Sequence, residues 1–128
     1  MAHPNEQILR GLDEAQERGD FEGFFSYYTD DTVAHLAGKS RLAGDYRGKD
    51  QLREAFGKFM EAVGEYSFKN HTYLADGEHG VVMQHSTSRR DGKTLELDET
   101  FVVHFRDGKV SEMWYQPVDQ DAFDDWVG

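Results

Sequence analysis

The stretch TVAHLAGKSRLAGDYRGKDQLREAFGKFM, residues 32–60, decides the fold of this chain, because it joins a strand to a long helix through a glycine-rich segment. Thr32 to Leu36 is rich in β-branched and apolar residues and predicts a strand whose end lies near His35. Three glycines then permit backbone turns that a Cβ would resist. From Lys49 to Val63, apolar residues recur at helical spacing. The chain therefore turns sharply and packs back on itself just after His35.

Two helices are expected before this stretch. Apolar residues recur on one helical face between Asn5 and Arg18, and Gly19 supplies an end. Asp20 can cap a second, short helix, whose aromatic stripe ends at Tyr28. A stripe of this kind belongs more often to a core than to a binding site, and the alternative is that Tyr28 contacts a ligand.

Four antiparallel strands are expected after the long helix. Three Asp-Gly pairs, each able to supply the positive φ of a tight hairpin, separate runs of alternating character. The approximate strands are residues 66–74, 80–90, 93–105 and 109–118. They are long enough to form a strongly curved sheet, and a helical turn from Asp119 to Trp126 closes the chain.

Composition limits the classes of protein that this chain can belong to. With 128 residues, 38% of them hydrophobic, residues 1–128 are expected to form a single domain with one core. The net charge of −11 argues against nucleic acid and anionic lipid as partners, since phosphate binding needs clustered Lys and Arg. No apolar run is long enough for a membrane span, and residues 1–7 lack a signal-peptide pattern, so a cytoplasmic location is expected.

The alternation of apolar and polar residues along the strands indicates which side chains face the interior. In the third long strand Glu99 is the one charged member of an otherwise apolar face that includes Phe101. Faces that mix apolar and polar groups favour a half-open pocket, because a polar side chain there can use water or ligand as a partner. His85 shares a face with Val81 and Met83, and for Trp114 a core position is the alternative to ligand contact. The substrate-binding candidates are Tyr28, Met83, His85, Phe101, Trp114 and Gln116.

The order of elements and four short motifs resemble the nuclear transport factor 2-like superfamily, and within it the SnoaL-like and ketosteroid-isomerase-like proteins. The motifs are GDFEG at 19–23, DDTV at 30–33, YRGKD at 46–50 and DGKV at 107–110. The resemblance implies a cystatin-like α+β fold, in which a cone-shaped, curved antiparallel sheet wraps around the long helix behind N-terminal helices. It also implies an internal pocket and, often, a homodimer across the outer face of the sheet.

The resemblance also suggests roles for individual residues. Matching DDTVAHLAG to ketosteroid isomerases sets His35 at the position of their general base, and a pKa near 6.5 suits a histidine for proton transfer. A structural polar role is the alternative for His35. Leu12 stands where those enzymes carry a donating tyrosine, so a steroid isomerase proper is not expected. Glu99 could act as an acid if apolar neighbours raise its pKa.

Asp119 is similar in its setting to the acidic residue that SnoaL-like cyclases use near the end of their last strand. The favoured alternative is that Asp119 caps the final helix.

Together these features predict a protein that binds a small, largely apolar molecule. The enzyme hypothesis is a cofactor-independent isomerase, cyclase or hydrolase that uses His35, Asp119 and Glu99 for acid-base chemistry. No pair of histidines has metal-ligating spacing and there is no cysteine, so neither a metal nor a cofactor is expected. The competing hypothesis is a ligand-binding or adaptor module of the same fold without turnover.

Overall fold

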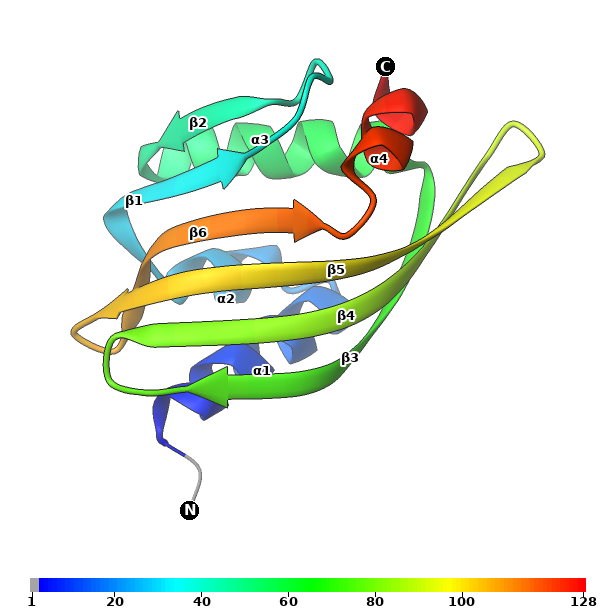
Figure 1. The fold of residues 1–128 in the computed structure, drawn as a ribbon. Helices are drawn as coiled ribbons and strands as arrows, with labels where there is room; N and C mark the ends of the chain where they lie inside the picture. Colours follow the sequence, from blue (N-terminus) through cyan, green and yellow to red (C-terminus); the bar gives the residue numbers. More distant parts are fainter. Residues whose placement is uncertain (1–2) are drawn as a thin grey trace.

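A curved, unclosed sheet of six strands carries helices on one face in the computed structural model, which describes residues 3–128 (Figure 1). The strand order is β2-β1-β6-β5-β4-β3. The expected α+β fold class is confirmed. The elements are α1 (Asn5–Arg18), α2 (Phe21–Ser26), β1 (Tyr28–Leu36), β2 (Gly44–Arg47), α3 (Gly48–Val63), β3 (Glu65–Ala75), β4 (His79–Arg90), β5 (Lys93–Arg106), β6 (Lys109–Pro117) and α4 (Gln120–Val127).

The N-terminal helices begin and end where local chemistry requires. Gly19 adopts a φ of 72° and its backbone N–H bonds back to α1, which ends the helix. Asp20 then caps α2, because its Oδ1 accepts a hydrogen bond from the Gly23 N–H at 3.0 Å. The second helix ends at Ser26, two residues before the expected end at Tyr28, since Tyr28 is the first residue of β1 and pairs with Val110.

The glycine-rich segment contains a strand that the sequence did not indicate. β2 pairs antiparallel with β1, so that His35 lies opposite Asp45. On its other edge β1 pairs parallel with β6, which makes the sheet mixed. The expected antiparallel meander is confirmed for β3 to β6.

Two of the three Asp-Gly hairpins form as expected. Asp91 and Asp107 each have a φ of 53°, and the glycine after each has a φ of 75°. The turn at Asp76 is built differently, because its Oδ1 accepts hydrogen bonds from the backbone N–H groups of Glu78 and His79.

The core lies between the helices and the inward face of the sheet, in two groups of buried apolar side chains. One surrounds Phe24 and Phe105, beneath α1 and α2, and the other surrounds Phe123 beneath α3 and α4. Phe101 and Met113 pack against both. Across residues 3–128, every helix is too short or too polar to cross a membrane.

Candidate functional site

An apolar cavity of about 130 Å³ lies between the helices and the sheet. Leu12, Phe56 and Phe59 supply the helical side of its wall, while Val82 and Phe101 supply part of the sheet side. A cavity whose wall is largely hydrophobic and carries a few polar groups has the usual form of a small-molecule site. Most polar residues of this wall fall into two clusters, and Gln16 and Tyr28 lie outside both.

The first cluster, named here the Glu99 cluster, consists of Glu99, Tyr66, Gln84 and Tyr115. Glu99 is only 2% exposed. Its Oε1 accepts hydrogen bonds from Gln84 Nε2 at 2.8 Å and from the Tyr66 hydroxyl at 3.2 Å, and its Oε2 accepts one from the Tyr115 hydroxyl. Tyr66, Gln84 and Tyr115 all line the cavity, so Glu99 stands directly behind its polar wall.

Burial raises the pKa of the Glu99 carboxyl, and hydrogen bonds from Ser86, Gln84 and Tyr66 offset part of that rise. Burial and the charge of Glu99 also hold the pKa of Tyr66 well above its ordinary value, so this phenol stays protonated. A protonated Glu99 becomes a donor, and a neighbouring tyrosine that accepts from it can turn its own hydroxyl toward the cavity. The arrangement can therefore pass a proton, or polarise an oxygen atom of a bound molecule.

The second cluster, named here the Asp13 cluster, consists of Asp13, Tyr73 and Asn70. Asp13 Oδ2 accepts a hydrogen bond from the Tyr73 hydroxyl. Asp13 Oδ1 and Asn70 Oδ1 are buried, and neither has a hydrogen-bond partner. Both residues line the cavity. A bulge of β3 between Asn70 and Thr72 shifts the alternation, which lets Asn70 and Tyr73 face the same side.

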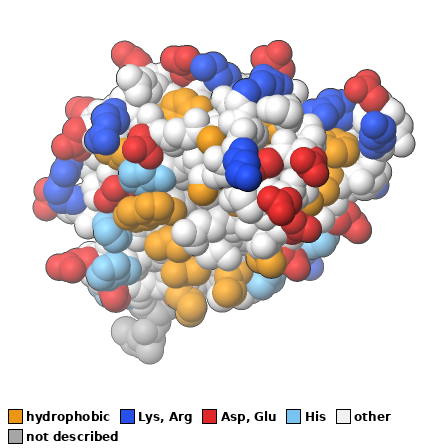
Figure 2. All heavy atoms as spheres, turned by 45° about the horizontal axis from the view of Figure 1, so that its top comes forward, with side chains coloured by type: hydrophobic (Ala, Val, Ile, Leu, Met, Phe, Trp, Pro, Cys, Tyr) orange, Lys and Arg blue, Asp and Glu red, His pale blue; other side chains and the backbone are white. Residues whose placement is uncertain are grey.

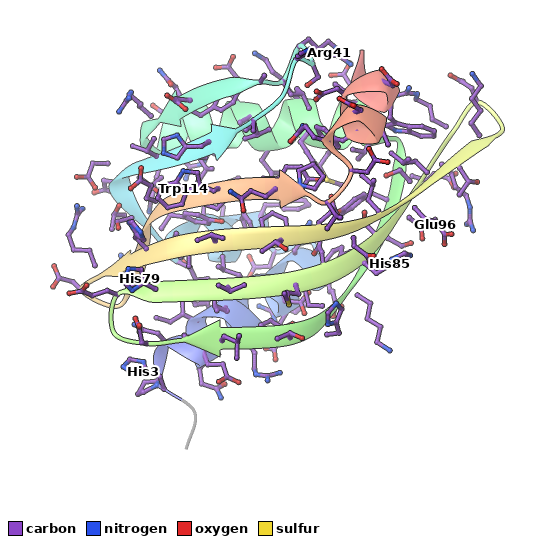
Figure 3. All side chains as sticks on the ribbon, viewed as in Figure 1. His3, Arg41, His79, His85, Glu96 and Trp114 are labelled. Atoms are coloured by element: carbon purple, nitrogen blue, oxygen red, sulfur yellow. The ribbon has the colours of Figure 1, made fainter. Side chains whose placement is uncertain are left out.

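The structure divides the substrate-binding candidates between two faces. Tyr28 and Phe101 line the cavity. Met83 and His85 lie on the outer face, because β4 turns its even-numbered residues Val82 and Gln84 inward. His85 instead pairs with Asp98 and Glu96 outside the sheet (Figure 3). Trp114 and Gln116 are likewise outside, since the intervening Tyr115 of β6 points inward.

His35 also lies on the outer face, between the inward-facing Ala34 and Leu36. Its Nδ1 contacts Asp45 Oδ1 at 2.6 Å and its Nε2 contacts Glu112 Oε2 at 2.6 Å. Burial lowers the pKa of His35, but the hydrogen bonds to the two carboxylates outweigh burial and the pKa is raised. The sheet therefore separates His35 from Glu99, and the two are not brought together. Figure 2 shows histidine side chains beside apolar ones on the surface.

Asp119 is the N-cap residue of α4, which is the role that the favoured alternative gave it. Its Oδ1 accepts a hydrogen bond from the Ala122 N–H at 3.0 Å at the start of α4. The side chain is exposed and is not part of the cavity wall.

Residues 9–113 match the family model of the SnoaL-like domain. The chain belongs to the SnoaL-like domain family. The resemblance to the nuclear transport factor 2-like superfamily is thereby confirmed, and the solved structures agree. This SnoaL-like domain matches no curated protein.

Several solved structures share the fold over nearly their whole length. A nuclear transport factor 2-like protein from Burkholderia xenovorans LB400 is 27% identical, with a TM-score of 0.83 over 97% of this chain and 95% of that one. TerC, co-crystallised with polyporic acid, is 22% identical, with a TM-score of 0.86 over 98% of each chain. A putative SnoaL-like polyketide cyclase from Jannaschia sp. CCS1 is 17% identical, with a TM-score of 0.82 over 99% of this chain and 96% of that one.

Sequence reasoning missed the polar residues that line the cavity of this SnoaL-like domain. Asp13 could have been identified from the sequence, because it follows Leu9 by four residues and so lies on the apolar face of α1. To identify Tyr66 and Gln84 as lining residues, the register of their strands must be known, and the hydrophobic pattern alone does not determine that register. Within residues 3–128, no three His, Asp or Glu side chains gather closely enough to hold a metal ion.

Proposed function

We propose that this SnoaL-like domain binds a small, largely apolar molecule in its cavity and acts on it as a cofactor-independent isomerase, cyclase or hydrolase. The observation that carries this proposal is the buried carboxyl of Glu99, which accepts hydrogen bonds from three side chains of the cavity wall. A buried acid with a raised pKa at the edge of an apolar pocket is a typical acid-base group.

The Glu99 cluster supplies the acid side of such a reaction. A neutral Glu99 donates its proton to Tyr66 or Tyr115, and that tyrosine donates its own proton to an oxygen atom of the substrate. Negative charge that develops on this oxygen is stabilised by a short hydrogen bond in surroundings from which water is largely excluded. The expected base role of His35 is not part of this proposal, because the sheet stands between His35 and the cavity.

The structural neighbours support a small-molecule site of this kind. TerC was co-crystallised with polyporic acid, and the Jannaschia protein is described as a putative polyketide cyclase. Both names refer to small organic molecules.

A ligand-binding module without turnover is the second candidate function. It is favoured by the position of Glu99 behind Tyr66 and Tyr115, since both hydroxyls are engaged by the carboxylate and not directed at the cavity. In that case the cluster would hold the wall rigid and orient a ligand without transferring a proton.

We also propose that the outer face of the sheet forms a homodimer interface. Leu74 and Met83 are 58% and 41% exposed on this face. Trp114 lies on the same face of β6, in a cross-strand row that runs through Val102 and Val81 to Leu74 (Figure 3). Large apolar side chains that remain exposed on one face of a monomer are typical of a surface that a partner covers.

The deciding experiment compares Glu99→Gln with Glu96→Gln, a matched change three residues away on the outer face. Both variants and the wild type are offered small cyclic ketones, lactones and epoxides, with turnover and binding followed together. We expect Glu99→Gln to lose about 10²-fold or more in kcat while it still binds, and Glu96→Gln to keep full activity. Unchanged turnover in Glu99→Gln would refute the acid role, and binding without turnover by the wild type would favour the ligand-binding module.

A further inference from the structure

We propose that the Asp13 cluster is a hydrogen-bond-accepting site that selects cavity ligands carrying a hydroxyl or N–H group. This inference rests on the proposed function only in that the cavity must bind a small molecule. It adds the chemical class of that molecule, which is a neutral or cationic apolar ring compound with a hydrogen-bond donor at one end.

The unpartnered oxygens are the first argument. Asp13 Oδ1 and Asn70 Oδ1 are buried in the cavity wall, yet neither receives a hydrogen bond from the described residues. Buried acceptors are almost always paired, and one left without a donor destabilises the folded state. Both oxygens belong to residues that line one cavity, and we infer that a ligand in the cavity supplies the missing donor.

The second argument is that the site is held in place. The Tyr73 hydroxyl donates to Asp13 Oδ2, which fixes the carboxylate and leaves Oδ1 free. The Arg10 guanidinium lies over the Tyr73 ring, 4.3 Å from its centroid, and keeps the ring in position. Burial and Asp13 raise the pKa of Tyr73 to about 12, so this phenol remains a donor at neutral pH. Asp13 is consequently oriented before any ligand binds.

Charge determines which donors fit. The Arg10 guanidinium bonds to Glu6 at 3.0 Å, so its own ion pair is not with Asp13. A carboxylate in the wall of an apolar cavity repels anions and attracts the positive end of an O–H or N–H bond. Phenols, alcohols and amines match this site, whereas carboxylates and phosphates do not.

The two clusters also limit the shape of the ligand. Tyr66 of the Glu99 cluster and Asn70 of the Asp13 cluster lie on the same face of β3, four residues apart. At roughly 3.3 Å per residue, this corresponds to about 13 Å along the strand. A molecule with a ring system between two polar ends can reach both clusters.

Matched probes test the inference. We would measure the binding of naphthalene, 2-naphthol and 2-methoxynaphthalene to ¹⁵N-labelled protein by NMR titration. The last two differ only in that methylation removes the donor. The wild type should bind 2-naphthol at least 10-fold more tightly than the ether. Asp13→Asn, which presents an N–H₂ group in place of one oxygen, should lose this preference. Glu14→Gln, a matched change at the exposed neighbouring position, should keep it.

Tyr73→Phe is a second variant, in which both oxygens of Asp13 are free, and it should still prefer 2-naphthol. Equal affinity of the wild type for 2-naphthol and its ether would overturn the inference and leave the ligand cavity intact. An unchanged preference in folded Asp13→Asn would do the same. If none of the three probes shifts the cavity resonances, both the inference and the proposed function are overturned.

Discussion

The imidazole of His35 stacks on the indole of Trp114, with ring centroids 5.0 Å apart and ring planes 19° from parallel. Carboxylates contact both nitrogens of the same imidazole, Asp45 at Nδ1 and Glu112 at Nε2. Since a carboxylate only accepts hydrogen bonds, the protonated imidazole is the form that satisfies both partners. His35 thereby links β1, β2 and β6 on the outer face of the sheet.

His35→Gln should therefore change how stability depends on pH. The pKa of His35 is raised in the folded state, so its stabilising contribution is complete below about pH 6.5 and is lost as pH rises through the folded-state pKa. We expect the difference in unfolding free energy between wild type and His35→Gln to be largest near pH 6 and to shrink toward pH 9. Urea denaturation at several pH values measures it. A difference in unfolding free energy that is the same at every pH would contradict this prediction.

Trp114→Arg should dissociate the proposed homodimer, because it replaces a large apolar side chain of the interface with a charge that is costly to bury. Light scattering after size exclusion should give the dimer mass for the wild type and the monomer mass for the variant. Glu61→Arg, on the exposed side of α3, should remain dimeric. If Trp114→Arg fails to fold, Met83→Glu on the same face replaces it. A folded variant with the wild-type mass would contradict the proposed interface.

Two substitutions at Asp119 separate capping from catalysis. Asn is as good an N-cap as Asp, so Asp119→Asn should keep the wild-type unfolding free energy, while Asp119→Ala should lose about 1 kcal/mol. Thermal or urea unfolding measures both. If Asp119 has only the capping role, Asp119→Asn should also keep full turnover. A large loss of turnover with unchanged stability would instead indicate an acid-base role.

Gly80→Ala should destabilise the fold, since a Cβ there would lie 2.8 Å from Phe105 Cε2 and 2.9 Å from Val103 Cγ2. Overpacking of this kind costs about 1–3 kcal/mol. Gly57→Ala is the matched control within α3, where a Cβ meets nothing within 4 Å. It should stabilise the protein by about 0.5–1 kcal/mol through helix propensity. Urea denaturation of the two variants should give changes of opposite sign.

Local chemistry made most of the fold predictable. Helix ends at Gly19 and Asp20, and hairpins at Asp91 and Asp107, depend on backbone preferences that a few neighbouring residues determine. β2 was not predicted, because its own four residues carry little strand propensity. These residues are extended because they pair with β1.

The site was less predictable, because it depends on which face of each strand turns inward. Glu99 and Phe101 were assigned correctly to the interior, since β5 carries a clear apolar face. In β4, Val81 and Met83 are as apolar as Val82, so composition did not distinguish the two faces. The position of His35 near the end of a strand suggested a role as a general base. Its side chain points outward because of the way β1 pairs with both β2 and β6.

The parallel pairing of β1 with β6 also affects the order of folding. Val33 lies opposite Glu112, so this pairing joins segments from the two ends of the chain. A contact of such long range closes a large loop and is slow to form, whereas the hairpins of β3 to β6 are local. On the ribosome, β1 must wait for almost the whole chain to be synthesised before its partner emerges. During that interval its inward apolar residues, Ala34 and Leu36, are exposed to other chains.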